Sequence, residues 1–393
     1  MNFMSRRLTF WTFGTAFALF LFAAAAPSPL YGLYALRWGF SSLEVTEVFA
    51  VYAIVLLAAL LLTGSLSDAV GRKPVVLAAL VIQIVSMGAF IAASGAGWLF
   101  AARSLQGLAT GLATGALAAA LVDLQPRERP GLAPLVNSVA PICGLALGAL
   151  LSAALVQLGP DPMRLVYGIL AVVFAVLVLV IFAAPEPASL SGQPSLRPRV
   201  GVSAEARPAF LAALPTLIAG WGVGGFYFSL GPSLASELSG SRDRLIGGAL
   251  LFTLAGVGAL VVLALSRWEP RTLMTLGVLA LIIGLGVTVL ALTSLSLAAL
   301  FAGTAITGVG FGIAWLGVLR TLIALAPAAS RGALLAAIYI VAYLAFAVPA
   351  VIAGYLVTRA GLHDASVWYA GAMDLLAVAG LAGTVLVGRP ART

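Results

Sequence analysis

The chain has 393 residues, of which 62% are hydrophobic and only 9% are charged. Soluble domains carry about 25% charged residues, so this composition excludes a soluble globular protein and indicates an integral membrane protein. The net charge of +8 comes from basic residues in short connections between apolar runs, which favours a role in membrane topology over nucleic-acid binding.

A membrane-spanning helix needs about 20 apolar residues, and the chain has room for a dozen such segments. In chain order we predict spans at residues 8–34, 45–66, 74–94, 97–122, 132–158, 163–183, 208–233, 244–266, 271–293, 297–323, 332–357 and 366–388. The longest polar stretch, 185–207, is rich in Pro, Ser and Arg and is typical of a cytoplasmic linker. We therefore predict an N-terminal six-helix bundle (1–184), the linker and a C-terminal six-helix bundle (208–393).

Basic residues are distributed unevenly between the two sides of the membrane. Twelve spans place both termini on one side, where fifteen Lys and Arg residues lie, against five on the other. The positive-inside rule then predicts cytoplasmic termini in a multi-pass protein of the cell (inner or plasma) membrane. Arg6-Arg7 and the apolar run after them imitate a signal peptide, but similar spans follow throughout, so we interpret this segment as an uncleaved first helix.

The two halves of the chain contain an internal repeat. Gly107, Gly111, Pro126 and Gly131 recur 201 residues later as Gly308, Gly312, Pro327 and Gly332, and Ser67 and Arg72 recur at a spacing of 199 as Ser266 and Arg271. Duplicated halves of six spans suit a transporter whose substrate site lies between them near mid-membrane.

The loop from Gly64 to Pro74 is the most densely charged connection between two apolar runs. Gly71 permits a tight turn and Pro74 suits the first turn of the next helix. The loop resembles the one between spans two and three of the major facilitator superfamily, a family of membrane transporters. The matching positions are Gly64, Leu66, Asp68, Gly71, Arg72 and Lys73.

This resemblance covers the whole chain and implies an all-α membrane fold with 12 transmembrane helices in two pseudo-symmetric six-helix bundles. It also implies alternating access and a cavity lined by spans 1, 4, 7 and 10. The loop would act as a conformational latch, in which Asp123, at the end of the fourth span, pairs with Arg72. The alternative is that the loop only sets topology and that Asp123 is a solvated charge.

Arg103 lies about two turns into the fourth span, and Gln106 shares its helix face. A basic residue deep in a span costs roughly 2.5–3.5 kcal/mol, so it requires a partner or a wet cavity. The resemblance ties this arginine to proton coupling, and snorkelling to the outer interface is the alternative. The first span has no acid, so the proton carrier is sought at Asp374, at Glu47 or at an acid near a helix end. For Asp374 the alternative is a polar packing contact or an interfacial position.

Aromatic residues recur on the spans that the resemblance assigns to the cavity. Such rings bind apolar or cationic organic molecules. We predict substrate contacts at Phe17, Trp221, Phe226, Trp315, Tyr339 and Tyr343, together with Arg103 and Gln106. Tyr31 and Tyr227 lie near span ends, where an interfacial aromatic belt is the alternative.

These features predict a secondary active transporter, an antiporter for proton-coupled efflux of small hydrophobic or drug-like molecules. Pro141 and Gly144 match part of the fifth-span pattern of drug–proton antiporters, whereas Ala140 and Leu145 replace expected glycines. The alternatives are a proton-coupled importer of an organic acid or sugar, and a non-transporting membrane sensor or scaffold.

The chemistry expected of this protein is binding and movement rather than catalysis. The spans contain no nucleophile–base pair and no nucleotide-binding loop of the G-x-x-x-x-G-K-[ST] kind, so we do not expect an enzyme or an ATP-driven pump. One Cys and one His do not suffice for a metal centre, and we expect no metal and no cofactor. The expected partners are a small-molecule substrate, protons and the lipid bilayer, without nucleic acid, and the protein is predicted to be a monomer.

Overall fold

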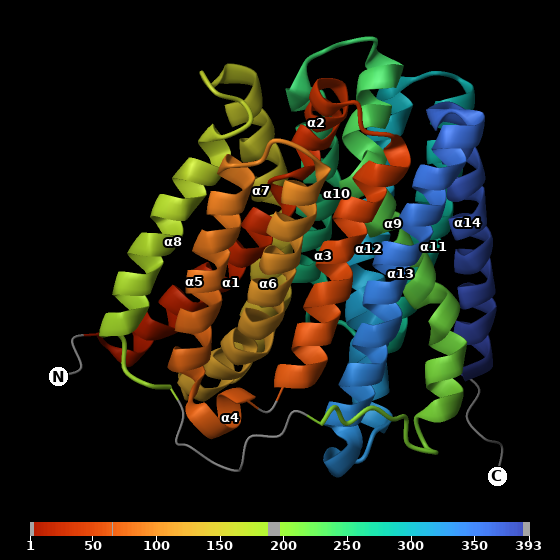
Figure 1. The fold of residues 1–393 in the computed structure, drawn as a ribbon. Coiled ribbons are helices and arrows are strands. Elements are labelled where there is room, and N and C mark those ends of the chain that lie inside the picture. The colour runs from red at the N-terminus through yellow and green to blue at the C-terminus, as the bar shows by residue number, and fades with distance from the viewer. Residues whose placement is uncertain (1–3, 65, 188–196, 388–393) are drawn as a thin grey trace. The chain divides into compact units, whose positions relative to one another are not determined.

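The computed structural model describes residues 4–64, 66–187 and 197–387, and its regular elements in these ranges are all helical (Figure 1). The first span is divided into α1 (Arg6–Ala25), the 3-10 turn η1 (Ser28–Leu30) and α2 (Tyr31–Trp38). The other spans are α3 (Ser42–Thr63), α5 (Arg72–Ile91), α6 (Ala96–Leu124), α7 (Leu132–Leu158), α8 (Leu165–Ala183), α9 (Arg207–Ser239), α10 (Arg244–Leu265), α11 (Pro270–Thr293), α12 (Leu297–Leu325), α13 (Arg331–Ala360) and α14 (Leu362–Val387). Two short elements, α4 (Leu66–Val70) and η2 (Ala328–Ser330), lie in connections.

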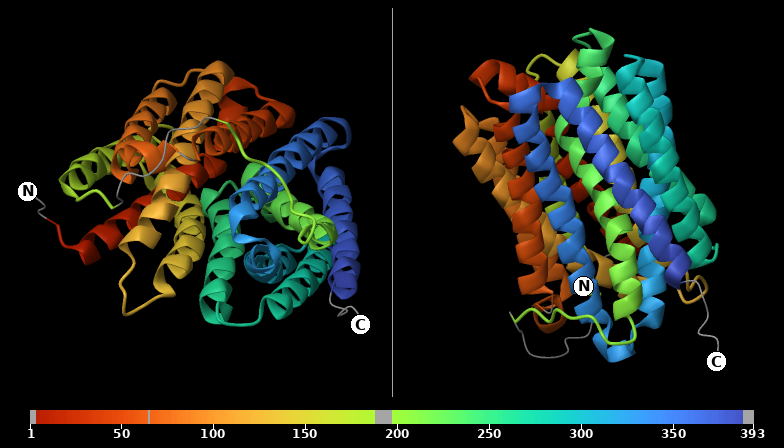
Figure 2. Two further views of the ribbon diagram at one scale, coloured as in Figure 1. Left: turned by 90° about the horizontal axis from the view of Figure 1, so that it is seen from below. Right: turned by 90° about the vertical axis from the view of Figure 1, so that its right-hand side faces the viewer.

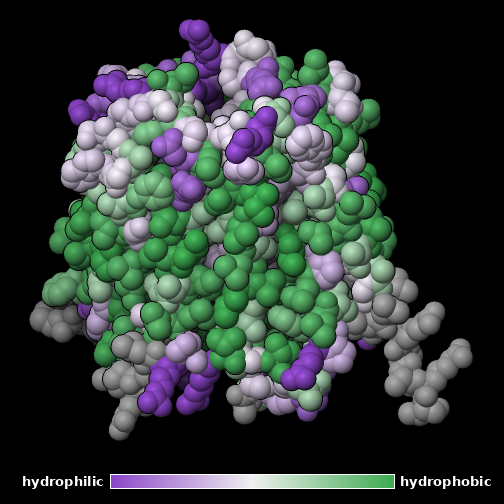
Figure 3. Space-filling model, turned by 45° about the vertical axis from the view of Figure 1, so that its right-hand side comes forward, coloured by the Kyte–Doolittle hydropathy of each residue, from purple (hydrophilic) through white to green (hydrophobic). Residues whose placement is uncertain are grey.

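Within the described residues, twelve helical segments are long and apolar enough to cross a membrane, which confirms the predicted all-α fold and span count. Figure 3 shows the physical basis: apolar side chains cover the middle of the helices, whereas hydrophilic side chains gather near their ends. In lipid, this arrangement leaves apolar surface facing acyl chains and satisfies the backbone polar groups inside each helix.

Helix ends follow local capping chemistry. The backbone N–H of Ser41 donates to Glu44 Oε2 at 2.7 Å, and the Glu44 N–H donates to Ser41 Oγ at 3.2 Å, a reciprocal capping box at the start of α3. Asp243 caps α10 by accepting from the Leu245 N–H at 2.9 Å. Helix α9 extends past Pro232, where the sequence pattern predicted its end near residue 233, and it stops only at Gly240, which adopts a left-handed conformation (φ 59°).

The chain folds into two compact units. The first contains residues 1–39 and 51–198, and the second contains residues 40–50 and 199–393, so the start of α3 groups with the second unit. The predicted domain boundaries at 184 and 208 stay a prediction.

The repeated glycines make equivalent contacts in the two units. In the first unit, a β-carbon on Gly107 or Gly111 of α6 would overlap backbone atoms of α3. In the second, a β-carbon on Gly308 or Gly312 of α12 would overlap backbone atoms of α10. Helices α11 and α12 also pack closely along their length (Figure 2). The repeat in sequence therefore encodes the same close approach of the fourth span to the second in each half.

Candidate functional site

The division of the first span creates a polar centre in the first unit. Pro27 has no backbone N–H, so it cannot donate to the carbonyl of Ala23 one turn earlier. Gln106 Nε2 donates to that carbonyl at 2.8 Å, and Arg103 Nη1 donates to the Ala24 carbonyl at 3.1 Å. Two side chains of α6 therefore satisfy backbone groups that the interruption of α1 leaves available.

Arg103 is only 1% exposed. Its Nη1 also donates to Gln106 Oε1, and its Cζ lies 4.2 Å from the centroid of the Tyr52 ring. The alternative of snorkelling to the outer interface is therefore wrong: the guanidinium stays inside the unit, where it is held by a carbonyl, an amide and an aromatic face.

Two tyrosines flank this guanidinium. Tyr31, at the start of α2, lies within electrostatic range of Arg103 and is 2% exposed, and Tyr52 on α3 is 4% exposed. Neither hydroxyl makes a hydrogen bond of ordinary geometry with the described residues. By contrast, Tyr34 and Tyr167 pair through their hydroxyls at 2.9 Å. An interfacial position for Tyr31 is thus wrong, and Tyr52 is a site residue that the sequence did not single out.

The second unit contains a connected cluster of five aromatic rings from α9, α12 and α13, which we call the aromatic cluster: Trp221, Trp315, Tyr339, Tyr343 and Phe346. Ring centroids of Trp221 lie 5.1 Å from those of Trp315 and Tyr343, both in edge-to-face geometry. All five side chains are only partly buried. Aromatic rings that cluster without being sealed in the core are suited to contact a ligand.

The structure places four of the six predicted aromatic contacts together and the other two elsewhere. Phe226 stacks on Tyr369, with ring centroids 4.8 Å apart, and has no ring contact with the aromatic cluster in the part of the chain that the structure describes. Phe17 lies in the first unit and is 5% exposed. Tyr227 is buried and bonds Thr304 at 3.0 Å, so it does not belong to an interfacial belt. Phe346 was missed, although it follows Tyr339 and Tyr343 on the same helix face.

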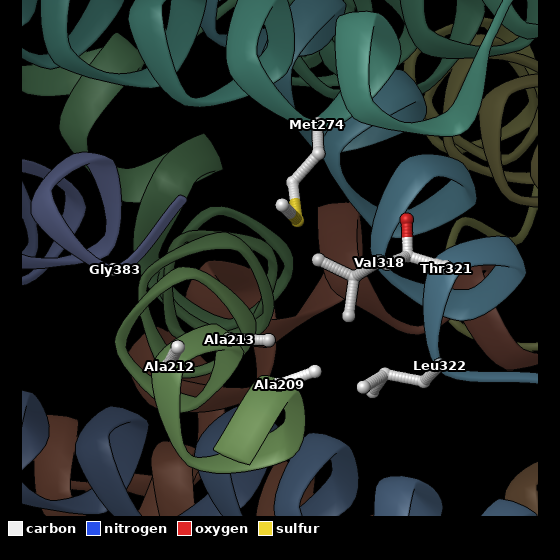
Figure 4. Close-up of a pocket in the computed structure, with 8 residues that line it drawn as sticks. All are labelled: Ala209, Ala212, Ala213, Met274, Val318, Thr321, Leu322 and Gly383. Carbon is white, nitrogen blue, oxygen red and sulfur yellow. The ribbon is translucent and has the colours of Figure 1, made fainter. Parts of the chain in front are cut away.

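Two small cavities lie in the second unit, one of them lined in part by the aromatic cluster. One is lined by Trp221, Trp315 and Phe311, among others, and the other is shown in Figure 4, where Met274, Val318 and Ala213 point into the same space. Each has a volume of about 10 Å³, room for roughly one water molecule. Ligand pockets typically measure about 300 Å³ or more, so neither cavity accepts a drug-sized molecule in this state.

In the charged segment after α3, the described residues make several ionic contacts. Arg72 forms an ion pair with Asp68, donates from Nη1 to Ser67 Oγ at 2.7 Å, and donates from Nε to Asp123 Oδ2 at 3.1 Å. The expected pairing of Arg72 with Asp123 is thus present, and its role as a latch stays a prediction. Gly64, at the end of α3, is exposed.

A second set of contacts joins the start of α5 to the end of α8. Glu186 Oε1 accepts from the backbone N–H of Arg72 at 2.7 Å, and Lys73 Nζ donates to the carbonyls of Phe182 and Ala184 at 2.6 and 2.8 Å. Each helix end thus receives a side chain from the other segment, of the charge that its dipole favours. Gly71 has φ 101°, a backbone conformation that other residues rarely adopt, and a β-carbon there would lie 2.9 Å from Glu186 Oε2, so this position favours glycine.

The two candidate proton carriers are residues of the second unit, with which the start of α3 groups. Asp374 is half-buried near the middle of α14, and no described residue donates a hydrogen bond to its Oδ1. Glu47 is half-buried one turn into α3. Both are acids within membrane-spanning helices, as the prediction requires, but the structure does not join either of them to the aromatic cluster.

Comparison with known proteins is consistent across sequence and fold. The chain is 29% identical over 282 residues to the multidrug resistance protein MdtL of Citrobacter koseri, which covers 70% of this chain and 71% of that protein. A bacterial homologue of the human lysosomal transporter Spinster, in an inward-facing and unoccupied conformation, superposes with a TM-score of 0.78 at 14% identity, covering 99% of both chains. The nucleoside transporter NupG superposes with a TM-score of 0.76 at 14% identity, covering 96% of this chain and 100% of the NupG chain.

Those structural likenesses establish the fold, and the sequence profile of the family settles membership. The profile of the Major Facilitator Superfamily matches residues 8–350, most of the chain. The chain therefore belongs to the Major Facilitator Superfamily, a family of membrane transporters, and is not an enzyme.

Proposed function

We propose that this protein exports small hydrophobic or drug-like molecules by alternating access, in exchange for protons. The observation that carries the proposal is the aromatic cluster. Its five partly buried rings offer large apolar faces and edges without a charged side chain among them. Such a surface binds flat apolar molecules and lipophilic cations with little demand for exact shape. The name of its relative MdtL, a multidrug resistance protein, supports this assignment.

Proton coupling needs a group that gains and loses a proton during the cycle. An arginine does not do so, because its guanidinium stays charged in proteins. We therefore assign proton exchange to Asp374 or Glu47. Arg103 contributes a positive charge that does not change during the cycle. Asp374 is the first choice, since its Oδ1 is buried without a hydrogen-bond donor among the described residues.

The proposal also assigns a role to the charged loop after α3 and an orientation of the chain in the membrane. Asp68, Arg72 and Asp123, with Gly64, Gly71 and Lys73 shaping the loop, close the cytoplasmic side in the outward-facing state. The basic residues of the even-numbered connections hold that side, and both termini, in the cytoplasm.

Transport in reconstituted proteoliposomes tests the function. With an imposed pH gradient, we expect ethidium to accumulate in the compartment from which protons leave, and Trp315→Ala or Tyr339→Ala to slow this at least tenfold. Trp368→Ala removes an indole that is 54% exposed and outside the cluster, and should leave the rate unchanged.

Dye movement that ignores the pH gradient would reject proton coupling, and equal rates in all three variants would reject the aromatic cluster as a binding surface. A dye or metabolite that moves with the protons instead of against them identifies an importer. A protein that moves none of the probes under any gradient fits the sensor or scaffold alternative.

A further inference from the structure

We propose that one corner of the first unit binds the headgroup of an anionic phospholipid. The site, which we call the basic corner, consists of Arg6, Arg7, Arg127 and Arg129. Two of these arginines begin α1, and the other two lie in the connection between α6 and α7. The inference concerns the surface that faces lipid, so it does not depend on the proposed transport function.

The two segments of the basic corner lie together at one end of the first unit (Figure 1). Arg6 Nη2 donates a hydrogen bond to the backbone carbonyl of Asp123, in the last turn of α6. Arg127 follows that carbonyl by only four residues. Helix α1 also packs against both α6 and α7. Arginines from distant parts of the sequence therefore share one surface, which three packed helices support.

None of the four arginines of the basic corner forms an ion pair with a described residue. All four are exposed, and the ion pairs in the described ranges belong to Arg72 and Arg164. Two acids lie in the same part of the chain. The Asp123 carboxylate is engaged by Arg72, which leaves only Glu128 against four positive charges. The corner therefore carries a net positive charge that the described chain does not compensate.

Exposed apolar side chains border the basic corner. On α1, Leu8 is 54% exposed and Trp11 is 46% exposed, and on α6, Val122 is 58% exposed. Trp11 lies one turn beyond Arg7 on the same helix face. An exposed Trp near the end of a span is typical of the headgroup level of a bilayer. A molecule on this surface therefore meets positive charges at one end and apolar side chains at the other.

An anionic phospholipid such as phosphatidylglycerol has both features that this surface requires. Its phosphodiester carries a negative charge and accepts the paired N–H donors of a guanidinium. Its acyl chains cover Leu8 and Trp11, which a soluble phosphate compound would leave exposed. Basic clusters beside a span attract anionic lipids in this way. Phosphatidylcholine has the same phosphate, but its quaternary ammonium group is repelled by the corner.

Fluorescence quenching by lipids with brominated acyl chains tests the proposal in nanodiscs of phosphatidylcholine. The quenching constant of Trp11 is the difference between wild type and Trp11→Phe. Near an anionic surface one arginine changes binding about fivefold, so we expect this constant to be about fivefold or more larger for brominated phosphatidylglycerol than for brominated phosphatidylcholine. Trp98, which is also 46% exposed and begins the same unit's α6 at its other end, should be quenched equally by both lipids.

Two matched double variants separate a site from general surface charge. Arg127→Gln with Arg129→Gln should bring the Trp11 quenching by phosphatidylglycerol close to the phosphatidylcholine level. Arg267→Gln with Arg271→Gln removes the same charge from exposed positions of the second unit and should leave the preference unchanged. Equal loss in both double variants would show a general charge effect and overturn the proposal.

The wild-type protein alone also decides the question, whether or not a variant folds. Equal quenching of Trp11 by the two brominated lipids contradicts the site. Glycerophosphoglycerol, the same headgroup without acyl chains, should not displace the lipid when added at the lipid's concentration. If it abolishes the preference, the basic corner binds soluble phosphate diesters and the assignment to a lipid is wrong.

Discussion

At the scale of single residues, the hydrogen bond from Gln106 to the Ala23 carbonyl depends on Pro27. A proline in the first span removes one backbone donor, and an amide 79 residues later replaces it, as shown by the 2.8 Å bond from Gln106 to Ala23. Arg103 and Gln106 could be singled out from the sequence because polar residues inside a span are costly. Their partners, the backbone carbonyls of Ala23 and Ala24, could not be predicted, because a carbonyl leaves no trace in the pattern of side chains.

The Pro27–Gln106 relation predicts a coupled pair of mutations. Gln106→Leu should lower the free energy of unfolding by about 1–3 kcal/mol, since it leaves the Ala23 carbonyl buried without a donor. In a Pro27→Ala background, the new backbone N–H can bond that carbonyl and the same change should cost less. Denaturation of the four proteins in detergent measures the coupling. Strict additivity would contradict the assignment.

Gly71 supports a second prediction at this scale. Its φ of 101° and ψ of 154° fall in a region that only glycine adopts easily, and Glu186 lies against the position of a β-carbon. Gly71→Ala should therefore destabilise the protein by about 1–3 kcal/mol. Gly88→Ala is the control, because nothing lies within 4 Å of its β-carbon position and it is inside helix α5, where alanine is favoured. A melting temperature that is equally low or equally unchanged in both variants would argue against local strain.

At the scale of elements, hydropathy predicted every span but not the shape of the first. The apolar run is continuous through Pro27 and Pro29, so hydropathy gives no sign of the break. Hydropathy measures transfer into lipid and does not report which backbone hydrogen bonds are formed. For the same reason the predicted end of α9 was too early. The capping box of Ser41 and Glu44, which depends only on local spacing, is confirmed.

The reciprocal contacts of Lys73 and Glu186 give a prediction for two helix ends. Glu186→Ala should remove the acceptor for the first backbone N–H groups of α5. The free energy of unfolding should then fall by about 1 kcal/mol, as it usually does when a helix cap is lost. Hydrogen exchange should quicken in the first turn of α5 and stay constant in its middle. Glu128→Ala, an exposed loop position, is the matched control. Unchanged exchange in that turn would show that the carboxylate does not cap the helix.

At the scale of the whole molecule, the half-chain repeat predicted the duplicated architecture, because glycines at one offset mark the same helix approach in each half. The aromatic cluster was predicted only in part. Tyr339 and Tyr343 share a face by spacing, whereas Trp221 and Trp315 join them through tertiary packing that no local pattern specifies.

The latch is a prediction about the whole transport cycle. Asp68→Asn should reduce transport at least tenfold, because Arg72 then loses one of its two carboxylate partners. Expression and melting temperature should stay unchanged. Asp161→Asn removes an exposed pair with Arg164 and should have no effect. Vesicle transport assays on both variants decide this, and a normal rate for the Asp68 variant would reject the latch.

The central claim is that two units open alternately to the two sides of the membrane, and electron spin distance measurements test it most directly. In a Cys143→Ser background, one label pair at Glu128 and Ala328 reports the predicted cytoplasmic connections, and a second pair at Asp161 and Ser294 reports the opposite side. Adding ethidium together with a pH change should lengthen one distance and shorten the other. Two distributions that stay fixed under all conditions would contradict alternating access.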